Sequence, residues 1–131
     1  AHGALLIDDS YNANPGSVMA AIDLLVDLPG ESVLVLGDMA ELGENSALQH
    51  EEVGCRAAHK GVGRLWATGA LSRHTVSAYK DAGTGDGRHF EDKAALLSAL
   101  QEIDQSGLNI LIKGSRSAAM DQIVSGLVEG E

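Results

Sequence analysis

Uninterrupted apolar runs alternate along the chain with segments in which apolar residues recur every three or four positions. The runs lie at 4–7, 33–36, 65–67 and 110–112, and His89–Phe90 indicates a further short strand. Continuous apolar runs of this length are typical of strands that are buried on both faces. They predict about five strands.

The segments between the runs have helical periodicity. The first begins after Asn14–Pro15, a good N-cap followed by a residue suited to the first helical position, and it ends before Pro29–Gly30. Further helices are expected at about 46–60, 71–79, 96–103 and 120–127. The Gly-rich stretch 82–87 (AGTGDG) is expected to be a loop.

Buried strands that alternate with amphipathic helices predict the fold class. They are typical of an α/β domain with a parallel sheet and helices on both faces. We therefore expect a doubly wound, mostly parallel, Rossmann-like sheet of about five strands.

Length, charge and cysteine content narrow the class of protein. The 131 residues suit a single domain, 1–131, with a formal charge of -10 and only one Trp, two Tyr and one Phe. So acidic a chain with so few aromatics is a poor candidate for binding nucleic acid or an anionic membrane. Its one cysteine, Cys55, excludes an intrachain disulfide, and no apolar run approaches the length of a membrane span.

Polar residues directly follow the predicted strands. They occupy the segments 8–15, 37–44, 68–69 and 113–117. In doubly wound sheets, ligands bind in the crevice beyond the carboxyl ends of the strands. These segments are therefore the candidate binding loops.

The segment after the last strand has the chemistry of an anion site. Lys113 and Arg116 supply positive charge, and Ser115 and Ser117 supply hydroxyl groups. A Gly-Ser turn that opens a helix would also aim backbone N–H groups at one point. The alternative is structural, with Lys113 paired to a strand-end aspartate and a serine capping the helix.

The first loop also has two interpretations. Asp8 and Asp9 could hold ribose hydroxyls or a metal, or they could serve only turn and capping roles. Tyr11 could stack on a base or cover an apolar edge, and Asn14 is suited to capping the helix that follows.

The remaining polar residues do not predict a metal site. Asp38, Glu41 and Glu44 could be ligands, although a solvated first helical turn is favoured for the two glutamates. His50 and His59 are nine positions apart, which is not metal-ligand spacing. With no P-loop and no nucleophile elbow in the sequence, no catalytic residue is assigned.

Three motifs resemble the C-terminal domain of the MurF branch of the Mur ligase family. They are DDSYNANPGSVMAAI (8–22), VLGDMAELGE (35–44) and ILIKGSRSAAMD (110–121). The resemblance runs in order over nearly the whole chain. Other Mur ligases and folylpolyglutamate synthase share the domain fold but carry different residues in the first loop.

The resemblance implies a three-domain, ATP-dependent ligase of the bacterial cytoplasm. Such an enzyme adds D-alanyl-D-alanine to UDP-N-acetylmuramoyl-tripeptide in peptidoglycan synthesis, through an acyl phosphate. An N-terminal domain would bind the uridine nucleotide, and a central domain would supply Mg²⁺ and most phosphate contacts. The chain would then be a monomeric fragment, beginning after an antiparallel strand of the family's sheet and inactive by itself.

The resemblance also implies residue roles. The expected ATP-binding residues are Asp9, Tyr11, Asn12 and Asn14. The expected D-alanyl-D-alanine-binding residues are Lys113, Ser115, Arg116, Thr68 and Gly69. The roles of Glu41 and Glu44 stay open.

A response-regulator receiver domain is the main alternative. It uses acidic residues after the first strand, a phosphorylated aspartate, a Ser or Thr, and a lysine, which Asp8, Asp9, Asp38, Thr68 and Lys113 imitate. Two features oppose it: Asp38 follows the second strand where receivers use the third, and Lys113 precedes Gly where receivers have Pro. An interaction module without a ligand is a second alternative.

Overall fold

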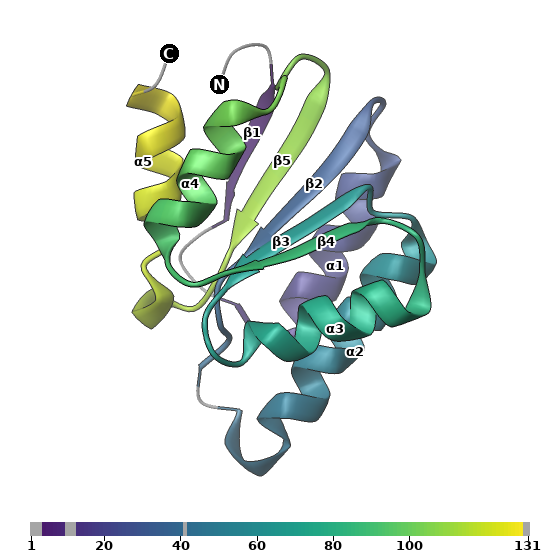
Figure 1. Ribbon diagram of the computed structural model, residues 1–131. Helices are drawn as coiled ribbons and strands as arrows, with labels where there is room; N and C mark the ends of the chain where they lie inside the picture. The colour runs from purple at the N-terminus through teal and green to yellow at the C-terminus, as the bar shows by residue number, and fades with distance from the viewer. Residues whose placement is uncertain (1–3, 10–12, 41, 130–131) are drawn as a thin grey trace.

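In the described part of the chain, residues 4–9, 13–40 and 42–129 of a computed structural model, five strands form one parallel sheet (Figure 1). The strands are β1 (Leu5–Asp9), β2 (Glu31–Leu36), β3 (Arg64–Thr68), β4 (Asp86–Phe90) and β5 (Leu108–Lys113). Their order is β1-β5-β2-β3-β4, and every neighbouring pair is parallel. The predicted fold class is confirmed.

The strand order places β5 between β1 and β2. In the register of the sheet, Lys113 lies beside Asp9 on one side and beside Leu36 on the other. Receiver domains have the flavodoxin-like order 2-1-3-4-5, in which the first strand is internal. Here β1 is an edge of the described sheet. The receiver interpretation, with Asp38 as phosphoacceptor, is therefore wrong.

Two layers of helices cover the sheet (Figure 1). One layer contains α1 (Pro15–Asp27), α2 (Ser46–Lys60) and α3 (Ser72–Ala82), and the other contains α4 (Lys93–Glu102) and α5 (Asp121–Glu129). Successive side chains of a strand point to opposite faces, so Leu34 packs under the first layer and Val33 under the second. None of these helices, within the described residues, has the length and apolar content needed to cross a bilayer.

The ends of the helices follow from local sequence chemistry. Asn14 Oδ1 accepts a hydrogen bond from the Ser17 N–H at 2.9 Å, and Ser17 Oγ accepts one from the Asn14 N–H at 3.1 Å. This capping box and Pro15 in the first turn start α1. α2 has the predicted limits, 46–60, and ends at Gly61 in the left-handed conformation with a φ of 83°.

One predicted strand start and one predicted helix-opening turn are wrong. β4 begins at Asp86 rather than His89, which shortens the predicted loop 82–87 to the residues before Asp86. The Gly-Ser turn after β5 leads into a short 3₁₀ helix, η2 (Arg116–Ala118), and α5 begins at Asp121, close to the predicted start at about 120. The serines therefore do not open an α-helix.

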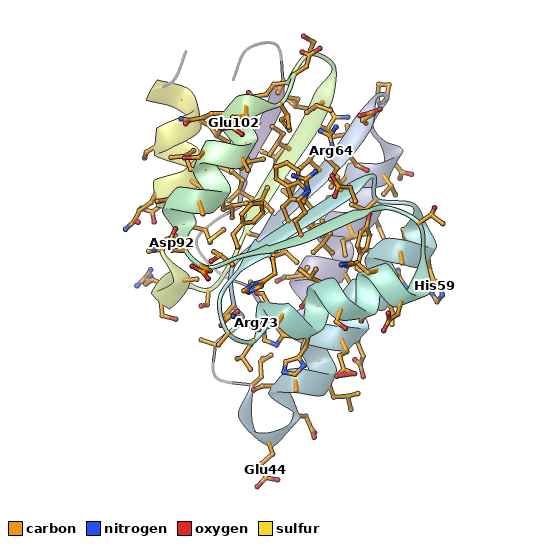
Figure 2. All side chains as sticks on the ribbon, in the orientation of Figure 1. Glu44, His59, Arg64, Arg73, Asp92 and Glu102 are labelled. Carbon is orange, nitrogen blue, oxygen red and sulfur yellow. The ribbon has the colours of Figure 1, made fainter. Side chains whose placement is uncertain are left out.

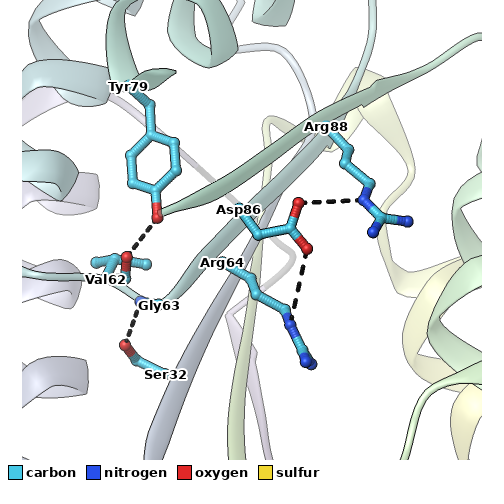
Figure 3. Close-up of polar contacts among 7 residues, drawn as sticks. All are labelled: Ser32, Val62, Gly63, Arg64, Tyr79, Asp86 and Arg88. Atoms are coloured by element: carbon cyan, nitrogen blue, oxygen red, sulfur yellow. Dashed lines mark hydrogen bonds and ion pairs between the residues drawn. The ribbon is translucent and has the colours of Figure 1, made fainter. Parts of the chain in front are cut away.

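Charged side chains cover the start of β3 and β4 (Figure 3). Asp86 lies 3.1 Å from Arg88 Nε and 3.9 Å from Arg64 Nε. The guanidinium carbons of Arg88 and Arg64 lie 4.8 and 6.0 Å from the ring centroid of Trp66, which is fully buried. The cluster stabilises this edge of the sheet through cation–π attraction and an ion pair on each side of Asp86.

Candidate functional site

A cavity of about 450 Å³ opens at the carboxyl ends of β2, β3, β4 and β5. This is where doubly wound sheets bind ligands, and the volume lies within the range of about 300–1,000 Å³ found for small-molecule sites. The described residues that line it are Gly37, Asp38, Met39, Ala40, Thr68, Gly69, Leu71, Glu91, Asp92, Lys93, Ser115, Ser117 and Ala118. We call it the strand-end cavity.

The ends of β2 and β5 join at one side of the strand-end cavity. The Gly37 N–H donates to the Lys113 carbonyl at 2.8 Å, and the Ser115 N–H donates to the Asp38 carbonyl at 3.1 Å. A Cβ on Gly114 would lie 2.6 Å from Met120 Cγ and 3.3 Å from the Gly37 Cα, so only glycine fits this approach. The Ser115 N–H is therefore used within the fold rather than aimed at an anion.

Asp38 holds the beginning of α3. Its carboxylate accepts hydrogen bonds from the Leu71 N–H at 3.1 Å, the Ser72 N–H at 2.7 Å and the Ser72 hydroxyl at 2.7 Å. Carboxylates are stabilising at helix N-termini because the N–H groups there lack helical partners. The structure thus gives Asp38 a capping role across 33 residues of sequence.

Thr68 and Gly69 lie at the end of β3, as expected. Gly69 has a φ of 114°, and a Cβ there would lie 2.3 Å from Asp38 Oδ1. The Thr68 hydroxyl donates to the Phe90 carbonyl at 3.0 Å, and His89 Nε2 donates to the Gly69 carbonyl at 2.7 Å. Both predicted residues therefore line the strand-end cavity while they also join β3 to its neighbours.

His50 was not predicted to act near the binding loops. It is buried on α2, and its Nε2 accepts a hydrogen bond from the Met39 N–H at 3.1 Å. Its Nδ1 lies 2.7 Å from the Ser46 carbonyl and donates to it. Because Nε2 accepts and Nδ1 donates, the imidazole is neutral and holds the loop that follows β2.

The predicted residues after β5 separate in space. Ser115 is buried and lines the strand-end cavity, with its hydroxyl 3.0 Å from that of Ser117. Lys113 is buried with 2% of its surface exposed, and Asp8 and Lys113 each have an interaction partner. Arg116 is exposed on η2, and neither it nor Lys113 is among the described residues that line the cavity.

Most of the predicted nucleotide loop lies outside the described residues, namely Tyr11, Asn12 and the side chain of Asp9. Glu41, in the loop after β2, also lies outside them. The capping interpretation of Asn14 is confirmed by the capping box. Glu44 is exposed in the short 3₁₀ helix η1 (Gly43–Asn45), at the tip that Figure 2 labels, away from the strand-end cavity.

The segment that follows β4 contributes residues that the sequence analysis missed. Lys93 Nζ donates to the Ala118 carbonyl on η2 at 3.0 Å, and Asp92 Oδ1 caps α4 by accepting from the Ala95 N–H at 2.8 Å. Glu91 also lines the strand-end cavity. A lysine in the first turn of an amphipathic helix looks like a solvent-facing residue, so only the three-dimensional contact with Ala118 distinguishes it.

Carboxylates and histidines do not gather into a metal site in the described part of the chain. No group of three or more His, Cys, Asp or Glu side chains there could hold a metal ion. The carboxylates of Asp38 and Asp92 are instead bound to helix N–H groups.

Solved structures of MurF ligases resemble this fold over nearly the whole chain. A MurF from Acinetobacter baumannii matches with a TM-score of 0.86 and 31% identity, over 96% of this chain and 28% of that one. A MurF ligase from Thermotoga maritima in complex with ADP matches with a TM-score of 0.83 and 25% identity, over 98% of this chain and 29% of that one.

Curated relatives give the same result at the level of sequence. The chain is 47% identical to the UDP-N-acetylmuramoyl-tripeptide–D-alanyl-D-alanine ligase of Escherichia coli K12, over 98% of this chain and 28% of the relative. It is 36% identical to the ligase of the same name from Bacillus subtilis 168, over 97% of this chain and 28% of the relative. The chain thus spans little more than a quarter of the length of these relatives.

A family model covers most of the sequence, including the candidate binding loops that follow β1, β2 and β3. The model for the Mur ligase, glutamate ligase domain matches residues 1–116. The match ends in the Gly-Ser segment after β5, so it includes all five strands of the described sheet. The chain belongs to the Mur ligase family.

Proposed function

We propose that the chain is the C-terminal domain of an ATP-dependent ligase that adds D-alanyl-D-alanine to UDP-N-acetylmuramoyl-tripeptide. The observation that carries this proposal is the strand-end cavity, in a chain that is 47% identical to a ligase of that name over 98% of its length. Its walls combine apolar groups from Met39 and Leu71 with hydroxyls from Thr68 and Ser115. Such a mixture suits a small ligand with methyl side chains and polar ends.

The proposed reaction joins two substrates through an activated carboxylate. ATP phosphorylates the tripeptide carboxylate to an acyl phosphate and leaves as ADP. The unprotonated amine of D-alanyl-D-alanine attacks the acyl carbon, the C–O bond to phosphate breaks, and the amine loses a proton. This domain contributes by holding the dipeptide with its amine directed at the acyl phosphate, which lowers the entropic cost of the attack.

The proposed dipeptide residues fall into two groups. Thr68, Gly69 and Ser115 line the strand-end cavity, where Gly69 leaves its backbone accessible and the hydroxyls can bind peptide groups. Lys113 and Arg116 come from the same β5–η2 segment and contribute positive potential beside the cavity. The chain as a whole is acidic and repels anions, so the positive charges of Lys113 and Arg116 make this edge the more favourable place for an anionic ligand.

The nucleotide is proposed to bind at the loop after β1. Its residues are Asp9, Tyr11, Asn12 and Asn14, with Asp9 directed to the ribose. In support, Asp9 is next to Lys113 in the register of the parallel sheet, so this loop begins at the same edge as the strand-end cavity. The similar Thermotoga maritima structure is a complex with ADP.

The other parts of the catalytic site are proposed to come from N-terminal and central domains of the same protein. They would bind UDP-N-acetylmuramoyl-tripeptide, Mg²⁺ and most of the ATP phosphates. The chain by itself would be an inactive, monomeric domain of a bacterial cytoplasmic enzyme, without nucleic-acid or membrane partners. Closure of this domain on the others would bring the strand-end cavity to the acyl phosphate.

An assay of the full-length protein tests the proposed function. Phosphate release should require ATP, UDP-N-acetylmuramoyl-tripeptide and D-alanyl-D-alanine together, and the 131-residue chain alone should release none. Ser115→Ala should raise the dipeptide KM by about 3- to 10-fold, because one hydrogen-bonding group is removed. Ser77→Ala, at an exposed position of α3, is the matched control and should leave the KM unchanged. Absence of dipeptide-dependent phosphate release would refute the proposal.

A further inference from the structure

Lys93 is a positively charged side chain at the strand-end cavity. It occupies the first position of α4, directly after Asp92, which caps that helix. Among the described residues that line the cavity, Lys93 is the one lysine or arginine. Resting on the proposed function, we propose that Lys93 binds the carboxylate of the incoming D-alanyl-D-alanine and selects ligands with a free carboxyl end.

The hydrogen bond to Ala118 positions the ammonium group of Lys93 but uses only one of its N–H donors. Lys93 Nζ donates to the Ala118 carbonyl at 3.0 Å, and an ammonium group has three N–H donors. One bond fixes the direction of the side chain, and two donors are left for a carboxylate. Because Ala118 itself lines the strand-end cavity, this contact holds the charge at the cavity wall.

Two of the carboxylates that line the strand-end cavity together with Lys93 already accept hydrogen bonds from the protein. The Asp38 carboxylate accepts three hydrogen bonds at the start of α3, and the Asp92 carboxylate accepts one at the start of α4. Both negative charges are therefore partly balanced by helix N–H groups. Glu91 is the remaining acid among the described lining residues, so the cavity has one cation and one acid outside the helix caps.

The other candidate cations are less well placed for this carboxylate. Arg116 is exposed on η2, and Lys113 is part of β5 with only 2% of its surface exposed and a partner of its own. Neither is among the described lining residues. Apolar atoms of Met39, Leu71 and Ala118 complete the wall, which suits a carboxyl end that carries a methyl group.

The test compares two dipeptides in the full-length ligase. D-alanyl-D-alaninamide is as small as D-alanyl-D-alanine but has no negative charge at its end. The wild type should prefer the acid over the amide by at least about 10-fold in kcat/KM, as expected for a charge-assisted hydrogen bond. Lys93→Met should lose most of this preference, by raising the KM of the acid while the KM of the amide stays within about twofold.

Two further variants separate binding from folding. Lys93→Arg keeps the charge and should recover a preference for the acid, whereas Lys93→Gln keeps a donor without charge and should not. Lys80→Met, at an exposed position near the far end of α3, removes an equivalent charge away from the strand-end cavity and should leave the preference intact. Thermal unfolding of each variant shows whether the fold is retained.

Three outcomes would show that Lys93 does not bind the carboxylate of the dipeptide. If Lys93→Met reduces kcat/KM equally for acid and amide, Lys93 only ties α4 to η2. If Arg116→Met abolishes the preference and Lys93→Met does not, Arg116 holds the carboxylate. If the wild type ligates neither dipeptide, the proposed function fails and the role of Lys93 fails with it, which distinguishes that case from the first two.

Discussion

Tyr79 shows how one buried side chain acquires a pH-dependent effect on the fold. It lies on α3 with 1% of its surface exposed, and its hydroxyl donates to the Val62 carbonyl (Figure 3). Burial, and to a lesser extent the negative charge of Asp86, raises the pKa of Tyr79 from 10.0 to about 12. The folded state therefore keeps the phenol neutral at a pH at which the unfolded chain ionises it.

We predict that Tyr79 lowers stability at high pH. Because its pKa is raised on folding, its contribution is complete below pH 10 and is lost as the pH rises to about 12. The slope in this interval should approach about 1.4 kcal/mol per pH unit. Tyr79→Phe cannot ionise, so the difference in unfolding free energy between wild type and variant, from urea titrations, should shrink across the interval. A difference that is constant from pH 9 to pH 12 would contradict this account.

Gly69 has no room for a side chain. Its φ of 114° strains any side chain, and a Cβ would also collide with the Asp38 carboxylate at 2.3 Å. Gly69→Ala should therefore destabilise the fold by about 2–4 kcal/mol in urea titrations. Gly61→Ala is the matched control, because Gly61 has a φ of 83° with nothing within 4 Å of an added Cβ. Equal losses in both variants would show that the contact with Asp38 contributes nothing.

The elements of the fold were predictable in proportion to their burial. β2 and β5 are buried along most or all of their length, so their apolar runs located them. β4 is an edge strand of half-buried or exposed residues, so only His89–Phe90 indicated it. The Gly-Ser segment after β5 contains helix-capping residues, but the chain forms η2 and then Ala119 with a φ of 52° before α5 begins.

The candidate site was predictable in position but not in detail. The rule for parallel sheets located the edge at which the strand-end cavity opens, and Thr68, Gly69 and Ser115 line that cavity. The bonds that give Asp38 and Lys93 their positions cross 33 and 25 residues of sequence. Such contacts depend on the order of the strands, which periodicity does not determine.

At the scale of a helix, we predict that the caps of α1 and α4 each stabilise the fold. Asn14→Ala removes the acceptor for the Ser17 N–H, and Asp92→Ala removes the acceptor for the Ala95 N–H. Each loss should cost about 1 kcal/mol of unfolding free energy, measured by urea denaturation. Asn14→Asp, which keeps an acceptor, should retain most of the stability. A neutral Asn14→Ala would mean that the Ser17 N–H is satisfied by water.

The whole molecule depends on one sheet shared by two separate cores. One core lies under α1, α2 and α3, and the other lies under α4 and α5. The single tryptophan, Trp66, belongs to the second core and is fully buried, with the Phe90 ring 5.6 Å away. Its fluorescence therefore reports directly on only one side of the sheet.

Because Trp66 lies in only one of the two cores, a substitution in the other core tests whether both cores unfold together. Val53 on α2 is fully buried in the core opposite Trp66, and Val53→Ala should remove about 1–3 kcal/mol of stability by leaving a cavity. If the sheet couples the two cores into one unfolding unit, the urea midpoint seen by Trp66 fluorescence should fall together with the midpoint seen by far-UV circular dichroism. Leu24→Ala, at a residue of α1 that is 72% exposed, is the control and should move neither midpoint appreciably. A Val53→Ala variant whose circular dichroism midpoint falls while the Trp66 midpoint stays would show that the two cores unfold separately.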